Sequence, residues 1–430
     1  MIYLSKFSDN TLKNSLFAQA IVKIFGSLIS IFVASLVARY LGSEKLGKLF
    51  FVLSVIGILS PISSLGIKGG LTAALCKNIN RKKYIQSALI LEIVGRTLVP
   101  LAFAPLIMIF ESNEVLLLYF LACIWNIFLS FEAIEVVLFN QHQGRLIAKV
   151  EFLGVLLNLC FVLFAVYTSM PIYAFVVMQI LNASYRFIAL LCICSETSLK
   201  DLLRPLSREI ILSLFKCSKP LILVGLTISL YTKIDQLMIQ WISGFSYLAY
   251  YTTSISSIER LCIFGPVLFN TFASKLSPEG ISKKEYIQNV VYYNRLAWLM
   301  GSFLAVIGIV FMPSLIMLLY GDEYSPASKV IYFFFPTIFA MIVGGASGVW
   351  LNVNGHTDIM IKRAALGAAI NIALNLVLIP RYNIYGAAVS TSIAYIASVY
   401  IVGVYTSKTK GYFLSLLLPF SSTSFFSSKA

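Results

Sequence analysis

The chain has 430 residues, of which 59% are hydrophobic and 12% are charged, and its mean hydropathy is +0.88. A soluble domain carries about 25% charged residues, so this composition excludes a soluble globular protein and indicates an integral membrane protein. The net charge of +15 does not indicate nucleic-acid binding, because the basic residues are spread between apolar runs and form no single basic face.

Twelve apolar segments, each of about 20 to 25 residues, are long enough to cross a bilayer as helices. The first is too long for the core of a signal peptide and has no small-residue cleavage site, so we expect no cleavable signal. In chain order the predicted spans are 15–38, 47–67, 85–110, 115–139, 148–168, 172–194, 219–241, 247–272, 292–319, 328–351, 359–379 and 384–406.

The distribution of lysine and arginine predicts the orientation of these spans. Most of the 33 basic residues fall in every second connection and near the chain ends, and few fall in the connections between. Cytoplasmic connections carry the excess of positive charge in membrane proteins. We therefore expect both termini in the cytoplasm.

A polar segment divides the chain into two predicted six-helix lobes. Residues 1–194 form the first lobe, 195–218 a cytoplasmic connecting segment, 219–406 the second lobe and 407–430 a tail. A weak internal repeat supports this division, because residues 36–51 align with 237–251 and place Gly42 near Gly244. The predicted fold is an all-α membrane protein with twelve transmembrane helices in two six-helix lobes around a central cavity.

Ionisable residues inside the spans are the candidate functional residues, because a charge at that depth costs several kcal/mol unless it faces a cavity or a partner. Lysine and arginine suit an anionic group such as a phosphate, and carboxylates can hold a transported ion. The candidate substrate-binding residues are Lys23, Arg96, Arg186, Lys233 and Arg260. The candidate ion-coupling residues are Glu92, Glu132, Glu135, Asp235 and Glu259.

Spacing separates two kinds of candidate in the first lobe. Glu92 and Arg96 stand four residues apart and share a helix face, so they can pair, and such a pair can also be purely structural. Glu132 and Glu135 also share a face. Two carboxylates so close raise one another's pKa, so one could carry a transported proton, and the alternative is that both are hydrated near the cytoplasmic interface.

The other charged candidates have no oppositely charged residue on the same face of their own predicted helix. Lys23 and Arg186 have no nearby acid in their spans, which makes them the preferred substrate contacts. Lys233 and Asp235 stand two residues apart and point in different directions on an ideal helix. Each therefore needs a partner from another helix, and Asp235 is as compatible with lobe packing as with ligand binding.

No catalytic or metal site emerges from the sequence. The two histidines, His142 and His356, fall in predicted cytoplasmic loops, and the seven cysteines form no CxxC pair. There is no phosphate-binding loop of the GxxxxGK[ST] type, so ATP is not expected as a direct energy source. We expect no metal, no organic cofactor and no enzymatic activity.

Four stretches resemble motifs of polysaccharide exporters, in the same order and over most of the chain. They are RYLGSEKLGKLF at 39–50, YTKIDQLMIQWISGFSYLAYYTTS at 231–254, LYGDEYSPAS at 319–328 and NIALNLVLIPRYNIYGAAVSTSIAY at 371–395. The sequence thus resembles the Wzx-type O-antigen flippases of the multidrug/oligosaccharidyl-lipid/polysaccharide exporter superfamily.

This resemblance implies alternating access between the two lobes. The implied substrate is an undecaprenyl-diphosphate-linked oligosaccharide, the repeat unit of O-antigen and lipopolysaccharide synthesis, flipped across the bacterial inner membrane. The implied energy source is a proton or sodium gradient. The implied partners are membrane lipids and the polymerase and chain-length machinery of the same pathway.

Two other functions remain open at this stage. A drug/cation antiporter of the same superfamily should favour acidic cavities, and the near balance of acids and bases inside the spans discriminates weakly against it. A polymerase or ligase of the same pathway is disfavoured, because no predicted outer loop is long enough to hold a glycosyl-transfer site.

Overall fold

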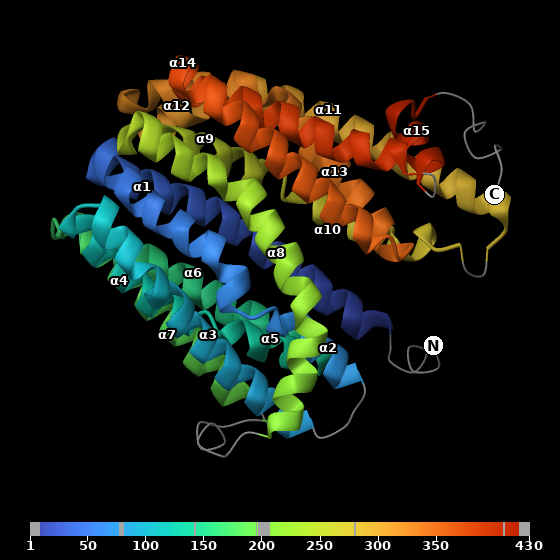
Figure 1. Ribbon diagram of the computed structural model, residues 1–430, viewed down its shortest axis with the longest axis horizontal. Coiled ribbons are helices and arrows are strands. Elements are labelled where there is room, and N and C mark those ends of the chain that lie inside the picture. Colours follow the sequence, from blue (N-terminus) through green and yellow to red (C-terminus); the bar gives the residue numbers. More distant parts are fainter. Residues whose placement is uncertain are drawn as a thin grey trace. The chain divides into compact units, whose positions relative to one another are not determined.

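The computed structural model describes residues 9–76, 81–141, 143–194, 196, 207–278, 281–406 and 409–420, without the side chains of 9–24, 73, 74, 76, 220, 267 and 274. These residues are helical with short 3-10 turns, and no strand occurs among them, which confirms the all-α prediction (Figure 1). The α-helices are α1 (Asp9–Ser63), α2 (Ile67–Cys76), α3 (Arg81–Phe110), α4 (Asn113–Phe128), α5 (Phe131–Asn140), α6 (Gly144–Tyr167), α7 (Ile172–Ile193), α8 (Arg208–Ser243), α9 (Phe245–Leu261), α10 (Phe264–Thr271), α11 (Lys283–Tyr320), α12 (Ser325–Val330), α13 (Phe335–Val353), α14 (Thr357–Tyr405) and α15 (Lys410–Leu417). Short 3-10 helices are η2 (Ala273–Leu276), η3 (Asp322–Tyr324) and η4 (Ile331–Phe334).

Within the described ranges, nine helical segments are long and apolar enough to cross a membrane, which confirms a multi-pass membrane protein. Two of them, Phe25–Thr72 and Thr357–Tyr405, each contain two of the predicted spans. The predicted span 247–272 is divided between α9 and α10, and each piece is too short to count alone. The number twelve therefore stays a prediction.

Sharp breaks inside the two longest helices explain this difference in number. The α1 backbone leaves helical geometry at Gly42 (φ 72°, ψ 172°), and the α14 backbone does so at Asn383 (φ 48°, ψ −132°). Gly244, which the sequence repeat aligns with Gly42, has nearly the same conformation (φ 96°, ψ 175°). Residues with a Cβ atom rarely adopt this conformation. Because both aligned glycines have it, the sequence repeat corresponds to a similar backbone turn in the two places.

The described chain forms two compact units. Unit 1 comprises Met1–Leu41 and Val52–Ser229, and unit 2 comprises Gly42–Phe51 and Leu230–Ala430. Helix α8 begins at Arg208, so the last part of the predicted connecting segment 195–218 is helical, whereas 195 and 197–206 lie outside the described residues. The predicted boundaries of the lobes stay predictions.

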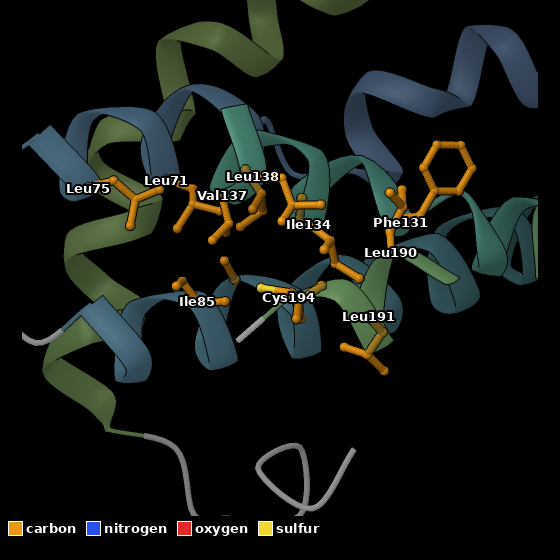
Figure 2. Close-up of a cluster of buried hydrophobic side chains, with 14 of the residues drawn as sticks. Leu71, Leu75, Ile85, Phe131, Ile134, Val137, Leu138, Leu190, Leu191 and Cys194 are labelled. Atoms are coloured by element: carbon orange, nitrogen blue, oxygen red, sulfur yellow. The ribbon is translucent and has the colours of Figure 1, made fainter. Parts of the chain in front are cut away.

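Unit 1 is built around a buried apolar cluster shared by α2, α3, α5, α6, α7 and α8 (Figure 2). Leu71 on α2, Ile85 on α3, Ile134 on α5 and Leu190 on α7 are each at most 1% exposed. Two glycines let α2 approach α8, because a Cβ atom on Gly69 or Gly70 would lie 2.0 or 2.4 Å from α8 side-chain atoms. This packing fixes α2 and α5, which carry charged residues of the site described below.

Unit 2 includes a short segment from the first part of the chain, Gly42–Phe51. The Ser43 N–H donates a 2.8 Å hydrogen bond to Glu323 Oε1 in η3. A Cβ atom on Gly47 would lie 2.0 Å from the Phe245 carbonyl oxygen, so only glycine permits the observed approach to α9. The segment Gly42–Phe51 therefore packs against η3 and α9, which both follow α8 in the chain.

The C-terminal helix α15 also packs within unit 2. The Tyr412 ring stacks on the Trp350 ring at 3.8 Å between centroids, and Asn294 Nδ2 donates to Ser415 Oγ at 2.9 Å. Trp298 Nε1 donates to the Leu416 carbonyl at 2.6 Å. The described part of the predicted tail 407–430 is therefore an integral element of unit 2, and 421–430 lie outside the described residues.

Candidate functional site

Four ionisable side chains in unit 1 form one connected group, the unit 1 charge cluster: Lys68, Glu92, Arg96 and Glu132. Arg96 donates to Glu92 Oε1 through Nη2 at 2.8 Å and through Nε at 3.0 Å. Its Nη2 also donates to Glu132 Oε2 at 2.9 Å. The Lys68 ammonium lies 3.0 Å from the same Glu132 oxygen. The pairing of Glu92 with Arg96, predicted from their spacing, is confirmed.

The inner part of this cluster is held rigidly. Glu92 and Arg96 are 0% and 1% exposed. Asn126 on α4 accepts from Arg96 Nη1 at 3.2 Å and donates to the Arg96 carbonyl at 3.0 Å. A buried ion pair needs such additional hydrogen bonds to offset the desolvation of both charges. Arg96 is therefore placed to orient Glu132 and has no exposed donor surface for a ligand.

The outer part of the cluster borders a cavity of about 530 Å³ within unit 1. Lys68 and Glu132 both line it, together with hydroxyl groups of Ser60, Ser64 and Ser229. Glycines and apolar side chains of α1, α2 and α8 form the remaining wall. The cavity has a size typical of small-molecule sites, about 300–1,000 Å³.

A second ion pair in unit 1 involves two predicted site residues. Arg186 on α7 lies 3.3 Å from Glu135 on α5, and its guanidinium lies 4.3 Å from the centroid of the Phe131 ring. The side chains of Arg186 and Glu135 are 25% and 19% exposed. Glu132 and Glu135 thus pair with different cations, and the predicted role of either in carrying a proton stays a prediction.

Unit 2 contains a different kind of polar group, the Asp235 network: Asp235, Tyr251, Asn371, Asn375 and Thr391. The Tyr251 hydroxyl donates to Asp235 Oδ2, and the Thr391 hydroxyl lies 3.4 Å from the same oxygen. Asn371 Nδ2 donates to Thr391 at 3.2 Å, and Asn375 Nδ2 donates to Asn371 Oδ1 at 2.8 Å. The break at Asn383 folds α14 back, which brings Asn371 and Thr391 together.

The Asp235 network is fully buried and its carboxylate has only neutral hydrogen-bond partners. Asp235 is 3% exposed, and no cation lies within ion-pair distance of it among the described residues. The buried Asn375 Oδ1 has no hydrogen-bond partner in the described part of the chain. A carboxylate surrounded by hydroxyl and amide oxygens is the ligand chemistry that a hard cation or a proton prefers.

The remaining predicted residues belong to neither group, although the charges of Lys233 and Glu259 act on Asp235. Lys233 is half-buried and pairs with none of the described acids. Glu259 is exposed, and Arg260 is half-buried beside the Tyr320 hydroxyl. Lys23 lies in α1, but its side chain falls outside the described residues, so its predicted role stays a prediction.

Sequence analysis missed several residues of both groups. Lys68 was placed in a connection, although it lies in the first turn of α2. Asn371 and Asn375 carry no charge and escaped a search for ionisable residues. Their spacing of four residues inside an apolar span is the signal that places two amides on one helix face.

Comparison with known proteins identifies the relatives of this chain. The sequence model of the family described as "Polysaccharide biosynthesis protein" matches residues 12–278. A probable low-salt glycan biosynthesis flippase, Agl15 of Haloferax volcanii, is 20% identical over 391 residues, which cover 87% of this chain and 79% of that protein.

Two solved structures share the fold. An inward-facing multidrug resistance MATE family transporter of the MOP superfamily aligns with a TM-score of 0.73 at 13% identity, over 94% of this chain and 100% of that chain. The lipid II flippase MurJ, in an inward closed conformation, aligns with a TM-score of 0.73 at 15% identity, over 93% of this chain and 90% of that chain. The fold is therefore that of this transporter superfamily.

Proposed function

Since the chain belongs to the polysaccharide biosynthesis protein family, we propose that it is a flippase that moves a lipid-linked oligosaccharide between the two leaflets of a membrane. The observation that carries this proposal is the charged cavity of unit 1, which lies among membrane-spanning helices and presents a lysine to its interior. A cation at that depth suits a cargo that brings an anionic group into the membrane. The glycan flippase relative supports the same cargo class.

We infer that the cargo is an undecaprenyl-diphosphate-linked repeat unit of an O-antigen or similar polysaccharide. The diphosphate would supply the anionic group, the isoprenoid chain would remain in the bilayer, and the sugars would cross through a polar path. In this proposal the protein lies in the bacterial inner membrane with both termini in the cytoplasm. Polymerase and chain-length proteins of the same pathway would receive the flipped product, and no bond is made or broken during transport.

We further propose that transport is coupled to a proton or sodium gradient through the Asp235 network. A buried carboxylate without a cation is costly unless its charge is compensated. Binding of H⁺ or Na⁺ at Asp235 supplies that compensation, and the partnerless Asn375 Oδ1 offers one more oxygen to a metal cation. Alternate binding and release on the two sides of the membrane would bias the conformational equilibrium that moves the cargo.

The drug/cation antiporter remains the second candidate because the MATE transporter shares the fold. The unit 1 cavity is lined by one cation and one carboxylate, so its formal charge does not decide between an anionic and a cationic cargo. The family match and the glycan flippase relative both favour a lipid-linked glycan as the cargo.

Reconstitution into liposomes tests the proposed function directly. Purified protein should move undecaprenyl-diphosphate-linked oligosaccharide from the inner to the outer leaflet, where an added glycosidase or lectin detects it. An imposed proton or sodium gradient should increase the rate. Export of a cationic dye without movement of the lipid-linked oligosaccharide would instead establish the antiporter.

A further inference from the structure

An apolar pocket of about 420 Å³, the α14 pocket, lies in unit 2 at the break of α14. Leu378 and Tyr382 line it from the part of α14 before the break. Tyr385 and Val389 line it from the part after the break, and Phe333 of η4 forms a further wall. Tyr382 and Phe333 are 58% and 43% exposed, so the pocket opens on the surface and is not an internal void.

The walls of the α14 pocket are held in place by contacts within unit 2. A Cβ atom on Gly386 would lie 2.3 Å from the Leu378 carbonyl oxygen, so only glycine permits the two parts of α14 to approach this closely. The Ser392 hydroxyl donates to the Phe333 carbonyl at 2.8 Å, which ties η4 to α14. The Phe333 and Tyr385 rings lie 5.3 Å apart between centroids. The pocket is therefore preformed, as ligand sites usually are.

The surroundings of the α14 pocket select a hydrocarbon chain as its occupant. Its lining residues are aromatic, aliphatic or glycine, and none carries a charge. They belong to two segments that are long and apolar enough to cross a membrane, Asp322–Val353 and Thr357–Tyr405. Lipid is the medium around such segments, and tyrosine side chains gather where the hydrocarbon meets the headgroups. A lipid chain therefore fits the pocket better than a water-soluble ligand does.

Two exposed cations lie next to the walls of the α14 pocket. Arg381 follows Leu378 by three residues and shares its helix face. Lys329 precedes Phe333 by four residues, and the backbone stays helical from α12 into η4. Neither cation forms an ion pair with an acid in the described part of the chain. Cations beside an apolar pocket suit an anionic amphiphile, because they can bind its phosphate group.

We propose that the α14 pocket binds an anionic phospholipid, with one hydrocarbon chain in the pocket and the phosphate group held by Arg381 and Lys329. The site shares no residue with the unit 1 charge cluster or with the Asp235 network, and its ligand is not the cargo. A zwitterionic lipid gains less from the two cations, because its own positive group already faces its phosphate. Binding stabilises unit 2, since the lipid joins η4 to both parts of α14.

Photo-crosslinking locates the lipid. The full chain is reconstituted in phosphatidylcholine nanodiscs that contain a small fraction of phosphatidylglycerol, or of phosphatidylcholine, with a diazirine group in one acyl chain. After illumination, mass spectrometry of the peptides identifies the crosslinked residues. Crosslinks of phosphatidylglycerol to the lining residues should exceed those of phosphatidylcholine about twentyfold, since each nearby cation contributes about a fivefold preference for anionic lipid.

Substitutions separate the contribution of the charges from that of the pocket. Arg381→Gln and Lys329→Gln should each lower the phosphatidylglycerol crosslinks about fivefold, and the double variant should lose the preference, while phosphatidylcholine crosslinks stay unchanged. Arg381→Lys should retain most of the preference. Val389→Phe fills the pocket and should lower the crosslinks of both lipids. The matched control is Lys45→Gln, which removes an exposed cation of unit 2 outside the pocket and should change neither.

Thermal stability gives a second measurement. Added phosphatidylglycerol should raise the melting temperature of the unsubstituted protein and of Lys45→Gln, and it should raise that of the double variant less. The same melting curves identify any variant that fails to fold. The two single glutamine variants and Arg381→Lys keep the test decisive if Val389→Phe is unstable.

Four outcomes would overturn the proposal. Equal crosslinking of both lipids to the unsubstituted protein would show that any acyl chain enters the pocket. Absence of crosslinks at the lining residues would show that no lipid occupies it. An equal loss in Lys45→Gln and Arg381→Gln would reduce the preference to general surface charge. Displacement of phosphatidylglycerol by a lower concentration of undecaprenyl phosphate would assign the pocket to the isoprenoid carrier.

Discussion

Unit 1 pairs Glu92, Glu132 and Glu135 with cations, whereas unit 2 surrounds the buried Asp235 with neutral hydrogen-bonding groups. Glu92 and Glu132 in unit 1 both contact Arg96, and the group continues to a half-exposed lysine at a cavity. Asp235 in unit 2 contacts the hydroxyl groups of Tyr251 and Thr391.

This difference separates two tasks that an ion-driven flippase must perform. The two cations and two carboxylates of the unit 1 charge cluster balance one another in formal charge. A buried carboxylate whose hydrogen-bond partners are all neutral is stabilised when a small cation or a proton binds. We therefore propose that unit 1 recognises the cargo and that unit 2 binds the coupling ion.

Neutralising Asp235 should have the largest effect on transport. Asp235→Asn keeps the side-chain volume and a hydrogen-bond acceptor for Tyr251, but it removes the charge that would bind H⁺ or Na⁺. We expect acceleration of flipping by an ion gradient to disappear in proteoliposomes, while the melting temperature stays near that of the unsubstituted protein. If flipping by this variant still accelerates in an ion gradient, the proposal that unit 2 binds the coupling ion at Asp235 is wrong.

Removing Arg96 should have the largest effect on stability. Arg96→Ala leaves Glu92 buried without its cation, which costs about 3–5 kcal/mol in comparable buried pairs. Thermal unfolding in detergent measures the loss. The double variant Glu92→Met/Arg96→Met removes both charges and should recover most of it, because apolar replacements of a buried pair are often neutral. Equal instability of the single and double variants would show that packing, and not charge, dominates here.

Substituting Gly42 should destabilise unit 2 by a smaller amount. The conformation of Gly42 is nearly restricted to glycine, so Gly42→Ala should cost about 1–3 kcal/mol. Gly345→Ala is the matched control, since an added Cβ there meets no atom within 4 Å. Thermal unfolding that responds equally to the two substitutions would contradict the assigned strain.

The smallest effect is expected at Arg81 and Glu196, an ion pair of unit 1 outside the membrane-spanning segments. Partial burial raises the pKa of Glu196, but hydrogen bonds from Arg81 and Gln141 outweigh it and lower that pKa below its ordinary value. The stabilisation is therefore present above the unfolded-state pKa, near 4.5, and is lost as pH falls through the lower folded-state pKa. Glu196→Gln should cost at most about 1 kcal/mol at neutral pH, and stability curves of the two proteins should converge at acidic pH.

The sequence predicted the helical membrane fold because long apolar runs carry that information locally. It also predicted the contact between Glu92 and Arg96, since both lie on one helix turn. The partner of Arg186 was not predictable, because Glu135 belongs to another helix and no spacing along the chain encodes their approach. Lys68 was not predicted as a site residue, because the glycines on both sides of it indicate a loop between two helices.

Arg363 is a buried cation whose burial could not be predicted from the sequence. Arg363, which was not among the candidate site residues, is 8% exposed and donates to the Ser398 carbonyl at 3.1 Å and to Ser347 Oγ at 2.9 Å. Its role in the structure is to join α13 to both halves of α14. Tertiary contacts alone distinguish such a structural cation from Lys68.

The assignment of residues 42–51 to unit 2 has a consequence for biosynthesis. During translation these residues emerge and enter the membrane long before Phe245 and Glu323 exist, so their final packing must wait for the second half of the chain. The first helical hairpin then remains incompletely packed until synthesis is nearly finished. Two separately expressed fragments, 1–206 and 207–430, should therefore resist proteolysis at this hairpin only when they are produced together.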